Sequence, residues 1–257
     1  MVTIYKRLGM SEKSFMNFLR KEYKTKSITT IAKEIKCDKE GLRIYFKKFN
    51  IRTRSCVERS CLRHRKKVSL SKKQKEILEG LILSDFHISK HSKKSEQARV
   101  SFGFKYKEFA EEIIKELIDL DFPPIYQDKK TNCFHSKSKS FVEIGDFHKR
   151  WYKDGKKIIP KDLKLTPEVC YWWYLGDGSI VDYGIKLSTD GFDLKFVKFL
   201  VRSLNDIGFQ STYIESNRIR IKSESVDDFL NYIGKCRVSC YKYKWKTKTK
   251  RKNYKWE

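Results

Sequence analysis

The pattern of apolar and polar positions predicts two similar halves from about residue 71 to residue 247. Each half begins with an apolar helix that ends in an aspartate, and continues with alternating strands, an amphipathic helix and further strands. Apolar spacings of three and four indicate helices, and strict alternation indicates strands. In the first half these segments are 74–85, 98–106, 107–120 and the strand 140–144; in the second they are 168–177, 183–189, 193–208, 211–216 and 218–222.

The predicted strands each have one apolar and one polar face. In the first half Arg99, Ser101 and Lys105 alternate with Val100, Phe102 and Phe104. In the second half the polar set is Lys186, Ser188, Arg218, Arg220 and Lys222, and it alternates with Ile185, Leu187, Ile219 and Ile221. A sheet with an apolar face on helices and a basic face toward solvent is suited to lie along a duplex groove. The alternative is a basic surface that is merely solvated.

A different pattern precedes residue 71. Ser27 and Asp38 are candidate N-caps of two short helices separated by the turn 36–38. In the second helix Leu42, Tyr45, Phe46 and Phe49 form one apolar stripe, whereas Lys39, Arg43 and Lys47 lie on other faces. The arrangement resembles a helix-turn-helix whose second helix enters the major groove. An ordinary helical hairpin with a basic face is the simpler interpretation.

The net charge of the chain indicates which class of partner it binds. The chain has 257 residues with 58 Lys and Arg against 32 Asp and Glu, a net charge of +26, and the first 70 residues carry 20 basic and 6 acidic residues. Such an excess repels itself in the folded state unless a polyanion neutralises it. We therefore expect double-stranded DNA as the partner and no membrane, because no apolar run is long enough to span one.

The seven cysteines suggest reduced thiols rather than a disulfide framework. The groups Cys56, Cys61, His64 and Cys236, Cys240 lack the spacing of a structural zinc site, and His87 with His91 would pair only on a helix. Without a signal-peptide pattern at the start, we expect an intracellular protein, in the cytoplasm of a bacterial or phage-infected cell or in an organelle.

Two carboxylates stand out at the ends of the apolar helices. Asp85 ends "ILEGLILSD" and Asp177 ends "VCYWWYLGD". The negative end of a helix dipole disfavours an anion by roughly 0.3 to 1 kcal/mol. If the two halves pack around these helices, the acids meet, and a divalent cation between them would relieve their repulsion. Small residues, namely Gly80, Ser84 and Gly176, would permit a close approach of the helices.

"LEGLILSDF" (78–86) and "CYWWYLGDG" (170–178) resemble the two motifs of single-chain LAGLIDADG homing endonucleases. Phe86, Trp172, Leu83 and Leu175 depart from that pattern. The resemblance implies an α/β fold with a pseudo-two-fold core of two αββαββα-type repeats that form a DNA-binding saddle, beside a small all-α helix-turn-helix domain. The expected organisation is a helix-turn-helix module (1–55), a basic linker (56–71), repeat 1 (72–160), repeat 2 (161–247) and a basic tail (248–257).

The resemblance also implies a catalytic site. Asp85 and Asp177 would hold the metal, Mg²⁺ with Mn²⁺ as a substitute, together with the neighbouring Ser84 and Gly176. "GKKIIP" and "SCYKYKW" resemble the segments that carry a basic residue near each metal, which indicates Lys157 and Lys242. Simple phosphate contact is the alternative for both lysines. Lys244 belongs to an alternating lysine and aromatic stretch that would bind the DNA backbone if it is extended.

The predicted function is a monomeric, site-specific endonuclease that hydrolyses one phosphodiester on each strand at a long asymmetric target and mobilises an intron or intein. Two alternatives use the same fold. One is an RNA-splicing maturase of group I introns, and the other is a regulator that binds DNA without cutting it.

Overall fold

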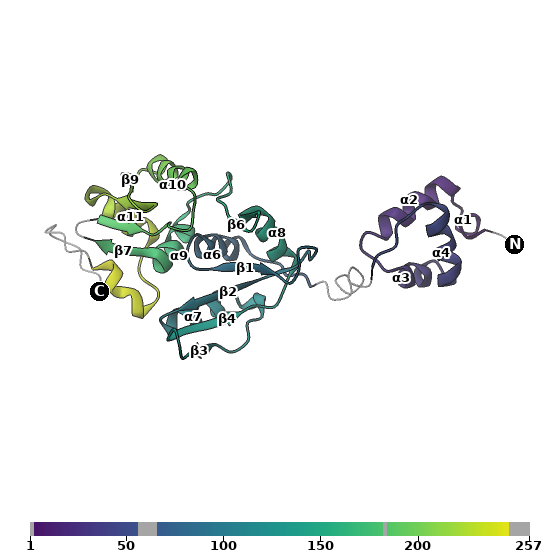
Figure 1. Ribbon diagram of the computed structural model, residues 1–257, viewed down its shortest axis with the longest axis horizontal. Coiled ribbons are helices and arrows are strands. Elements are labelled where there is room, and N and C mark those ends of the chain that lie inside the picture. Colours follow the sequence, from purple (N-terminus) through teal and green to yellow (C-terminus); the bar gives the residue numbers. More distant parts are fainter. Residues whose placement is uncertain (1–2, 56–65, 182–183, 247–257) are drawn as a thin grey trace. The chain divides into compact units, whose positions relative to one another are not determined.

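The computed structural model describes residues 3–55, 66–181 and 184–246 (Figure 1). The chain divides into two compact units, residues 1–65 and 66–257. The predicted linker lies partly, and the predicted tail and the group Cys56, Cys61 and His64 wholly, outside the described residues.

The first unit consists of helices around a small core of its own. Its helices are α1 (Ile4–Arg7), α2 (Glu12–Glu22), α3 (Ile28–Glu34) and α4 (Lys39–Lys48). The Ser27 side chain accepts a hydrogen bond from the Thr30 amide, and Asp38 accepts from the amides of Glu40 and Gly41, so both predicted caps are confirmed. Phe15, Leu19, Ile31, Leu42 and Phe46 are almost fully buried between the helices. The turn between α3 and α4 includes Lys36 at a φ of 49°.

The second unit repeats one order of elements. The first repeat contains α6 (Lys72–Leu83), β1 (His87–Lys90), β2 (Ala98–Phe104), α7 (Lys107–Glu116), η1 (Ile118–Leu120), β3 (Tyr126–Asp128), β4 (Cys133–Lys137) and α8 (Val142–Trp151). A short hairpin, β5 (Tyr152–Lys153) and β6 (Lys156–Lys157), follows. The second repeat contains α9 (Pro167–Asp177), β7 (Gly178–Val181), β8 (Gly184–Leu187), α10 (Leu194–Asp206), β9 (Ser211–Ile214), β10 (Arg218–Ile221), η2 (Ser223–Ser225), α11 (Val226–Ile233) and η3 (Ser239–Trp245). The predicted αββαββα order is therefore confirmed.

The two four-stranded antiparallel sheets have equivalent topologies, β1-β2-β4-β3 and β7-β8-β10-β9. In β2 Val100, Phe102 and Phe104 are buried, while Arg99 is exposed. In β10 Ile219 and Ile221 are buried and alternate with half-buried arginines. The alternation of apolar and basic faces that the sequence predicts is thus present in both sheets.

The predicted strand 140–144 is wrong. Only Phe141 is extended, in a bridge with Ala98, and α8 begins at the next residue. Ile144, Phe147 and Trp151 recur at helical spacing and pack on the core of the unit, so the apolar period of three and four outweighs the local strand preference of Phe and Val. Within the described residues, no helix is long and apolar enough to cross a membrane.

Candidate active site

The helices α6 and α9 pack against each other at the centre of the second unit (Figure 1). Ser71 and Gln74 form a capping box at the start of α6, and Thr166 followed by Pro167 starts α9. Every side chain from Val169 to Leu175 is buried, which explains the run of aromatic residues in the second motif. Asp177 is the last residue of α9, and Asp85 follows the end of α6 by two residues.

Glycines allow the two helices to approach closely. A Cβ atom on Gly80 would lie 2.4 Å from the Val169 carbonyl oxygen and 2.8 Å from the Trp172 Cβ. A Cβ on Gly176 would lie 2.4 Å from the Ser84 Oγ. All three distances are shorter than van der Waals contact, so the expected close crossing of these helices is confirmed.

The departure of the second motif at Trp172 is accommodated by the same crossing. Gly80 and Trp172 occupy the same place in their motifs, and the missing side chain of Gly80 leaves room for the Trp172 Cβ. The Trp172 Nε1 donates to the Glu168 carboxylate at 2.7 Å, and its ring lies 5.9 Å from that of Phe109, centroid to centroid. One small and one large residue therefore replace the pair of small residues that a symmetric crossing would have.

The two acids influence each other. Burial and the Asp85 carboxylate together raise the pKa of Asp177 to about 7, although Lys157 and Lys244 act in the opposite direction. Asp85 itself is exposed. Two carboxylates that repel each other, one exposed and one partly buried, are oxygen donors that a divalent cation fits.

Lys157 lies at the end of α6. Its Nζ donates to the carbonyl oxygens of Ile82 at 2.8 Å and Ser84 at 2.7 Å. Burial lowers the pKa of Lys157 to about 8, and the carboxylates of Asp177 and Asp85 oppose that shift. The ammonium group therefore satisfies terminal carbonyls of the helix and offsets the unfavourable position of the acids.

Lys244, rather than the predicted Lys242, occupies the matching place at the end of α9. Its Nζ donates to the carbonyl oxygens of Leu175 at 2.6 Å and Tyr174 at 3.3 Å. Burial lowers its pKa to about 8, and Asp177 opposes that shift. Lys242 is exposed. The Lys244 side chain is only 6% exposed, so the predicted contact of this residue with the DNA backbone does not agree with the structure.

The conformation of residues 239–245 explains why Lys244 and not Lys242 lies at the end of α9. The sequence suggests an extended stretch in which all the lysines share one face, whereas residues 239–245 form the 3₁₀ helix η3. With about three residues per turn, Tyr241 and Lys244 lie on the same side, and both are buried. Residues two apart, such as Lys242 and Lys244, face different directions.

Ser84 and Gly176 lie beside the acids as expected, but the polar groups of Ser84 are engaged by the protein. The Ser84 hydroxyl donates to the Leu81 carbonyl, and the Ser84 carbonyl accepts from Lys157. Among the described residues, no cluster of three or more His, Cys, Asp or Glu side chains could hold a metal ion. A pair of carboxylates would suit Mg²⁺ or a similar ion, which keeps several waters and also binds substrate phosphates.

Most of the predicted DNA-contacting residues of the core lie on the outer faces of the two sheets. In the second sheet the row Ser179, Lys186, Arg220 and Thr212 crosses all four strands. In the first sheet His87, Ser101 and Lys137 are register partners. Arg99, Lys105 and Lys222 are exposed, and Arg218 is paired with Asp190 at 3.0 Å. The Ser188 amide donates to the Asp177 carbonyl, which places this predicted residue next to the acids.

The sequence prediction missed Lys137, and it assigned Lys244 to the DNA backbone rather than to the end of α9. Lys137 lies on β4, where the alternation Cys133, His135, Lys137 was available as a signal. His87 and His91 do not form a metal site: His87 begins a strand, and its Nδ1 lies 3.3 Å from the Tyr152 hydroxyl. The five cysteines among the described residues are free thiols.

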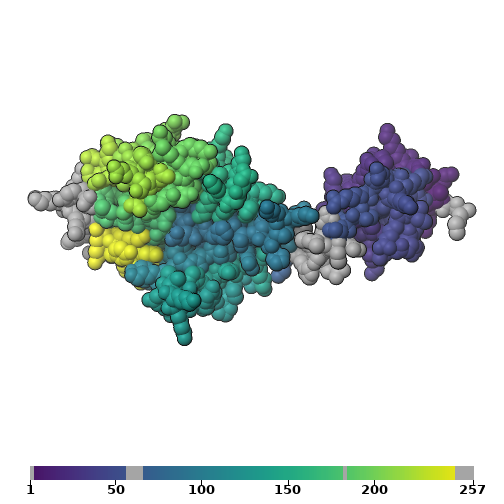
Figure 2. All heavy atoms as spheres, viewed as in Figure 1, coloured from purple at the N-terminus to yellow at the C-terminus, as the bar shows by residue number. Residues whose placement is uncertain are grey.

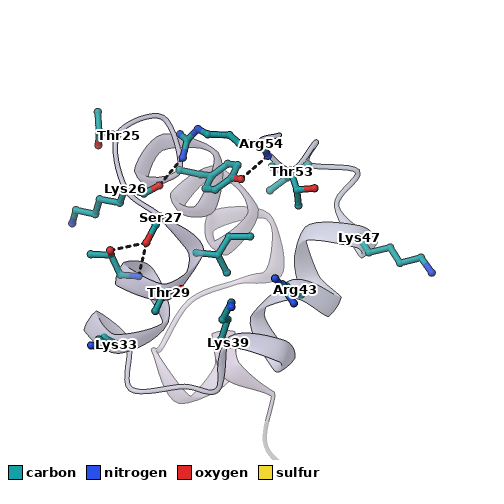
Figure 3. A pocket seen from close by; sticks show the side chains of 14 residues that line it. Thr25, Lys26, Ser27, Thr29, Lys33, Lys39, Arg43, Lys47, Thr53 and Arg54 are labelled. Carbon is teal, nitrogen blue, oxygen red and sulfur yellow. Dashed lines mark hydrogen bonds between the residues drawn. The ribbon is translucent and has the colours of Figure 1, made fainter. Parts of the chain in front are cut away.

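In the first unit, the predicted residues Lys39, Arg43 and Lys47 line a groove between α3 and α4 (Figure 3). Lys33 contributes from α3. Arg43 is paired with Glu40 at 2.7 Å, whereas Lys33, Lys39 and Lys47 make no ion pair within the part of the chain that the structure describes. The groove is therefore basic and largely uncompensated.

Comparisons with known proteins agree with this geometry. Residues 75–229 match the profile of the LAGLIDADG DNA endonuclease family. An uncharacterized protein of Methanocaldococcus jannaschii is 32% identical over 139 residues, which cover 51% of this chain and 48% of that protein. A probable intron-encoded endonuclease of Wickerhamomyces canadensis is 28% identical over 199 residues, which cover 68% of this chain and 84% of the relative. A cytochrome b mRNA maturase of Debaryomyces hansenii is 35% identical over 68 residues, which cover 26% of each chain.

Among solved structures, the homing endonuclease I-WcaI bound to its DNA recognition sequence is similar in fold, with a TM-score of 0.63 and 22% identity; the match covers 77% of this chain and 96% of that one. The matched regions span about half and about a quarter of the relatives from M. jannaschii and D. hansenii. The family profile, in contrast, covers more than half of this chain and includes both motifs and both sheets. The chain therefore belongs to the LAGLIDADG DNA endonuclease family.

Proposed function

We propose that this protein is a site-specific endonuclease that cuts both strands of double-stranded DNA and hydrolyses one phosphodiester in each. The proposal rests on one observation above all: an aspartate lies at the end of each of two central helices, and at each helix end a lysine, half-buried Lys157 or buried Lys244, donates to the terminal carbonyl oxygens. Two similar acid and lysine sets around a pseudo-two-fold axis suit two similar reactions on the two antiparallel strands of a duplex.

The residues of the chain have separate tasks. Asp85 and Asp177 would hold Mg²⁺, with Mn²⁺ as a substitute, and the cation would supply an activated water and charge stabilisation for phosphodiester hydrolysis. Lys157 and Lys244, whose pKa values are lowered to about 8, remain largely protonated at neutral pH. Their ammonium groups oppose the rise in the pKa of Asp177 and would stabilise negative charge that develops on the phosphate.

The outer faces of the sheets bind the duplex. Arg99, Ser101, Lys105 and Lys137 would contact one half of the target, and the residues of the second sheet, Lys186, Ser188, Arg218, Arg220 and Lys222, would contact the other half. The two sets differ in residue type along equivalent strands. Because different side chains read different base edges, a long and asymmetric target follows for a chain that acts as a monomer.

The first unit adds a second contact with DNA. The unpaired lysines of the groove, Lys33, Lys39 and Lys47, are suited to phosphates, and an α-helix such as α4 fits a major groove about 12 Å wide. Arg43 and Ile44 lie at the centre of the exposed surface of α4, where Ile44 is 68% exposed. An exposed aliphatic side chain between cations is suited to the methyl group of thymine.

The direct test is to incubate the protein with DNA from the flanks of its own gene. A discrete double-strand cut that requires Mg²⁺ or Mn²⁺ and disappears with a chelator is the expected result. Binding without any cleavage under these conditions would contradict the proposal and favour a regulator.

The maturase remains a second candidate because of the similarity to the D. hansenii protein. Splicing of an intron that carries this reading frame, measured in vitro with and without the protein, separates the two activities. Both acids are present here, and RNA splicing by such a protein would not require them.

A further inference from the structure

The 3₁₀ helix η3, which carries Lys244, belongs to the second repeat but is hydrogen-bonded to the first. The Glu108 carboxylate accepts three hydrogen bonds from its first turn: from the Ser239 amide at 2.6 Å, the Ser239 hydroxyl at 2.7 Å and the Cys240 amide at 3.0 Å. Glu108 belongs to the first turn of α7 in the first repeat. In Figure 2 the yellow atoms of this segment lie against the blue atoms of the first repeat.

Aromatic contacts continue the same attachment toward the lysine. The Tyr241 ring lies 5.2 Å from that of Tyr106 and 5.0 Å from that of Phe109, both edge-on and measured between centroids. The Lys244 Nζ is 4.5 Å from the centroid of the Tyr241 ring. The chain of contacts therefore runs from Glu108 through the first turn of η3 to Tyr241 and then to Lys244.

Lys157 is held in a different way. It lies on the β5-β6 hairpin, which is closed by antiparallel pairing between Tyr152 and Lys157 in its own repeat. The Lys157 Nζ lies 6.0 Å from the Phe192 ring, and its hydrogen bonds within the described part of the chain go to α6 and the residue that follows it, not to α7. A change at Glu108 therefore acts on one lysine and leaves the other in place.

We propose that Glu108 is a positioning residue for one of the two strand cleavages: it fixes the start of η3 and thereby the place of Lys244 at the end of α9. The inference rests on the proposed endonuclease function. A short helix without a capping group frays, because its first amides lose their partners. The Glu108 carboxylate supplies an acceptor for two of these amides from outside η3.

Strand-resolved cleavage tests the inference, with a target labelled on either strand. Lys244→Met identifies which strand depends on Lys244. We expect Glu108→Ala to slow the cleavage of that same strand by about tenfold or more, so that nicked duplex accumulates, while the other strand is cut at the wild-type rate. Glu108→Asp, which retains the carboxylate, is expected to recover part of the lost rate.

Glu111→Ala is the matched control, because Glu111 is an exposed residue of the same helix and forms an ion pair with Lys107 at 3.0 Å. It should cut both strands at wild-type rates. Equal slowing of both strands by Glu108→Ala, or no slowing at all, would overturn the inference. Absence of cleavage by the wild-type protein would instead contradict the proposed function, so the two failures are distinguishable.

Discussion

At the scale of the residue, the central feature is a carboxylate that the fold keeps in an unfavourable place. Asp177 is largely buried, and its pKa is raised to about 7 by burial and by Asp85. In the unfolded chain an aspartate titrates near pH 3.9. Between about pH 4 and pH 7 the folded protein therefore binds more protons than the unfolded one. Its stability falls as the pH rises through this window.

It follows that Asp177→Asn stabilises the metal-free protein at pH 8, by roughly 1 to 3 kcal/mol, and has little effect near pH 4. Urea unfolding with a chelator, measured at both pH values, checks this. Asp206→Asn, which removes an exposed carboxylate of the same unit, is the control and should be neutral. Equal stability of wild type and Asp177→Asn at pH 8 would show that the ionised Asp177 carboxylate does not destabilise the fold.

The two acids could be identified from the sequence because a carboxylate at the end of an apolar helix is locally unfavourable and occurs twice. Lys157 was indicated by the resemblance of its segment and lies beside the acids. Lys244 could not be separated from Lys242 by spacing alone. An alternating sequence has period two, and the tight period of η3 is set by contacts with residues such as Glu108, which lies 131 positions away from Ser239.

At the scale of the element, the crossing of α6 and α9 decides where the acids meet. Gly80→Ala would place a methyl group 2.4 Å from the backbone oxygen of Val169, which cannot move without moving α9. We expect a loss of about 1 to 3 kcal/mol in the free energy of unfolding, as for other overpacked cores. Denaturant unfolding measures it.

Gly191→Ala is the control for Gly80→Ala, because no atom lies within 4 Å of the methyl group that it would add. It should change stability by less than about 0.5 kcal/mol. A neutral Gly80→Ala would mean that the helices do not approach as closely as described.

Elements with a strong period were predictable: α6, α9, α10, β2 and β10 lie within a few residues of their expected positions. Shorter elements were not. The hairpin of β3 and β4, the strand β1 and the helix α11 depend on pairing or packing with distant segments, as in the register of Phe102 with Ser136. The predicted strand 140–144 includes only the first three residues of α8, which are too few to show its helical spacing.

At the scale of the whole molecule, charge governs binding. Two units carry basic surfaces, and only the second matches the family profile. The double substitution Lys39→Ala and Lys47→Ala should weaken DNA binding. It should also reduce the slope of log affinity against log salt by up to about 1.8, since each neutralised phosphate contributes about 0.9. Fluorescence anisotropy with a labelled target at several salt concentrations measures both quantities.

A matched double variant, Lys13→Ala and Lys21→Ala, removes two exposed lysines of α2, which is outside the groove. Its slope should stay at the wild-type value. A groove variant with unchanged affinity and slope would remove the first unit from the binding surface.

The central claim is that one acid from each repeat serves a shared metal site. The most direct measurement is cleavage of the target by Asp85→Asn and by Asp177→Asn, each with Mg²⁺ and with Mn²⁺, alongside DNA binding of the same variants. Each single substitution should reduce the rate of double-strand cleavage at least a hundredfold, while DNA binding is retained. A variant that still cuts both strands at the wild-type rate would contradict the claim.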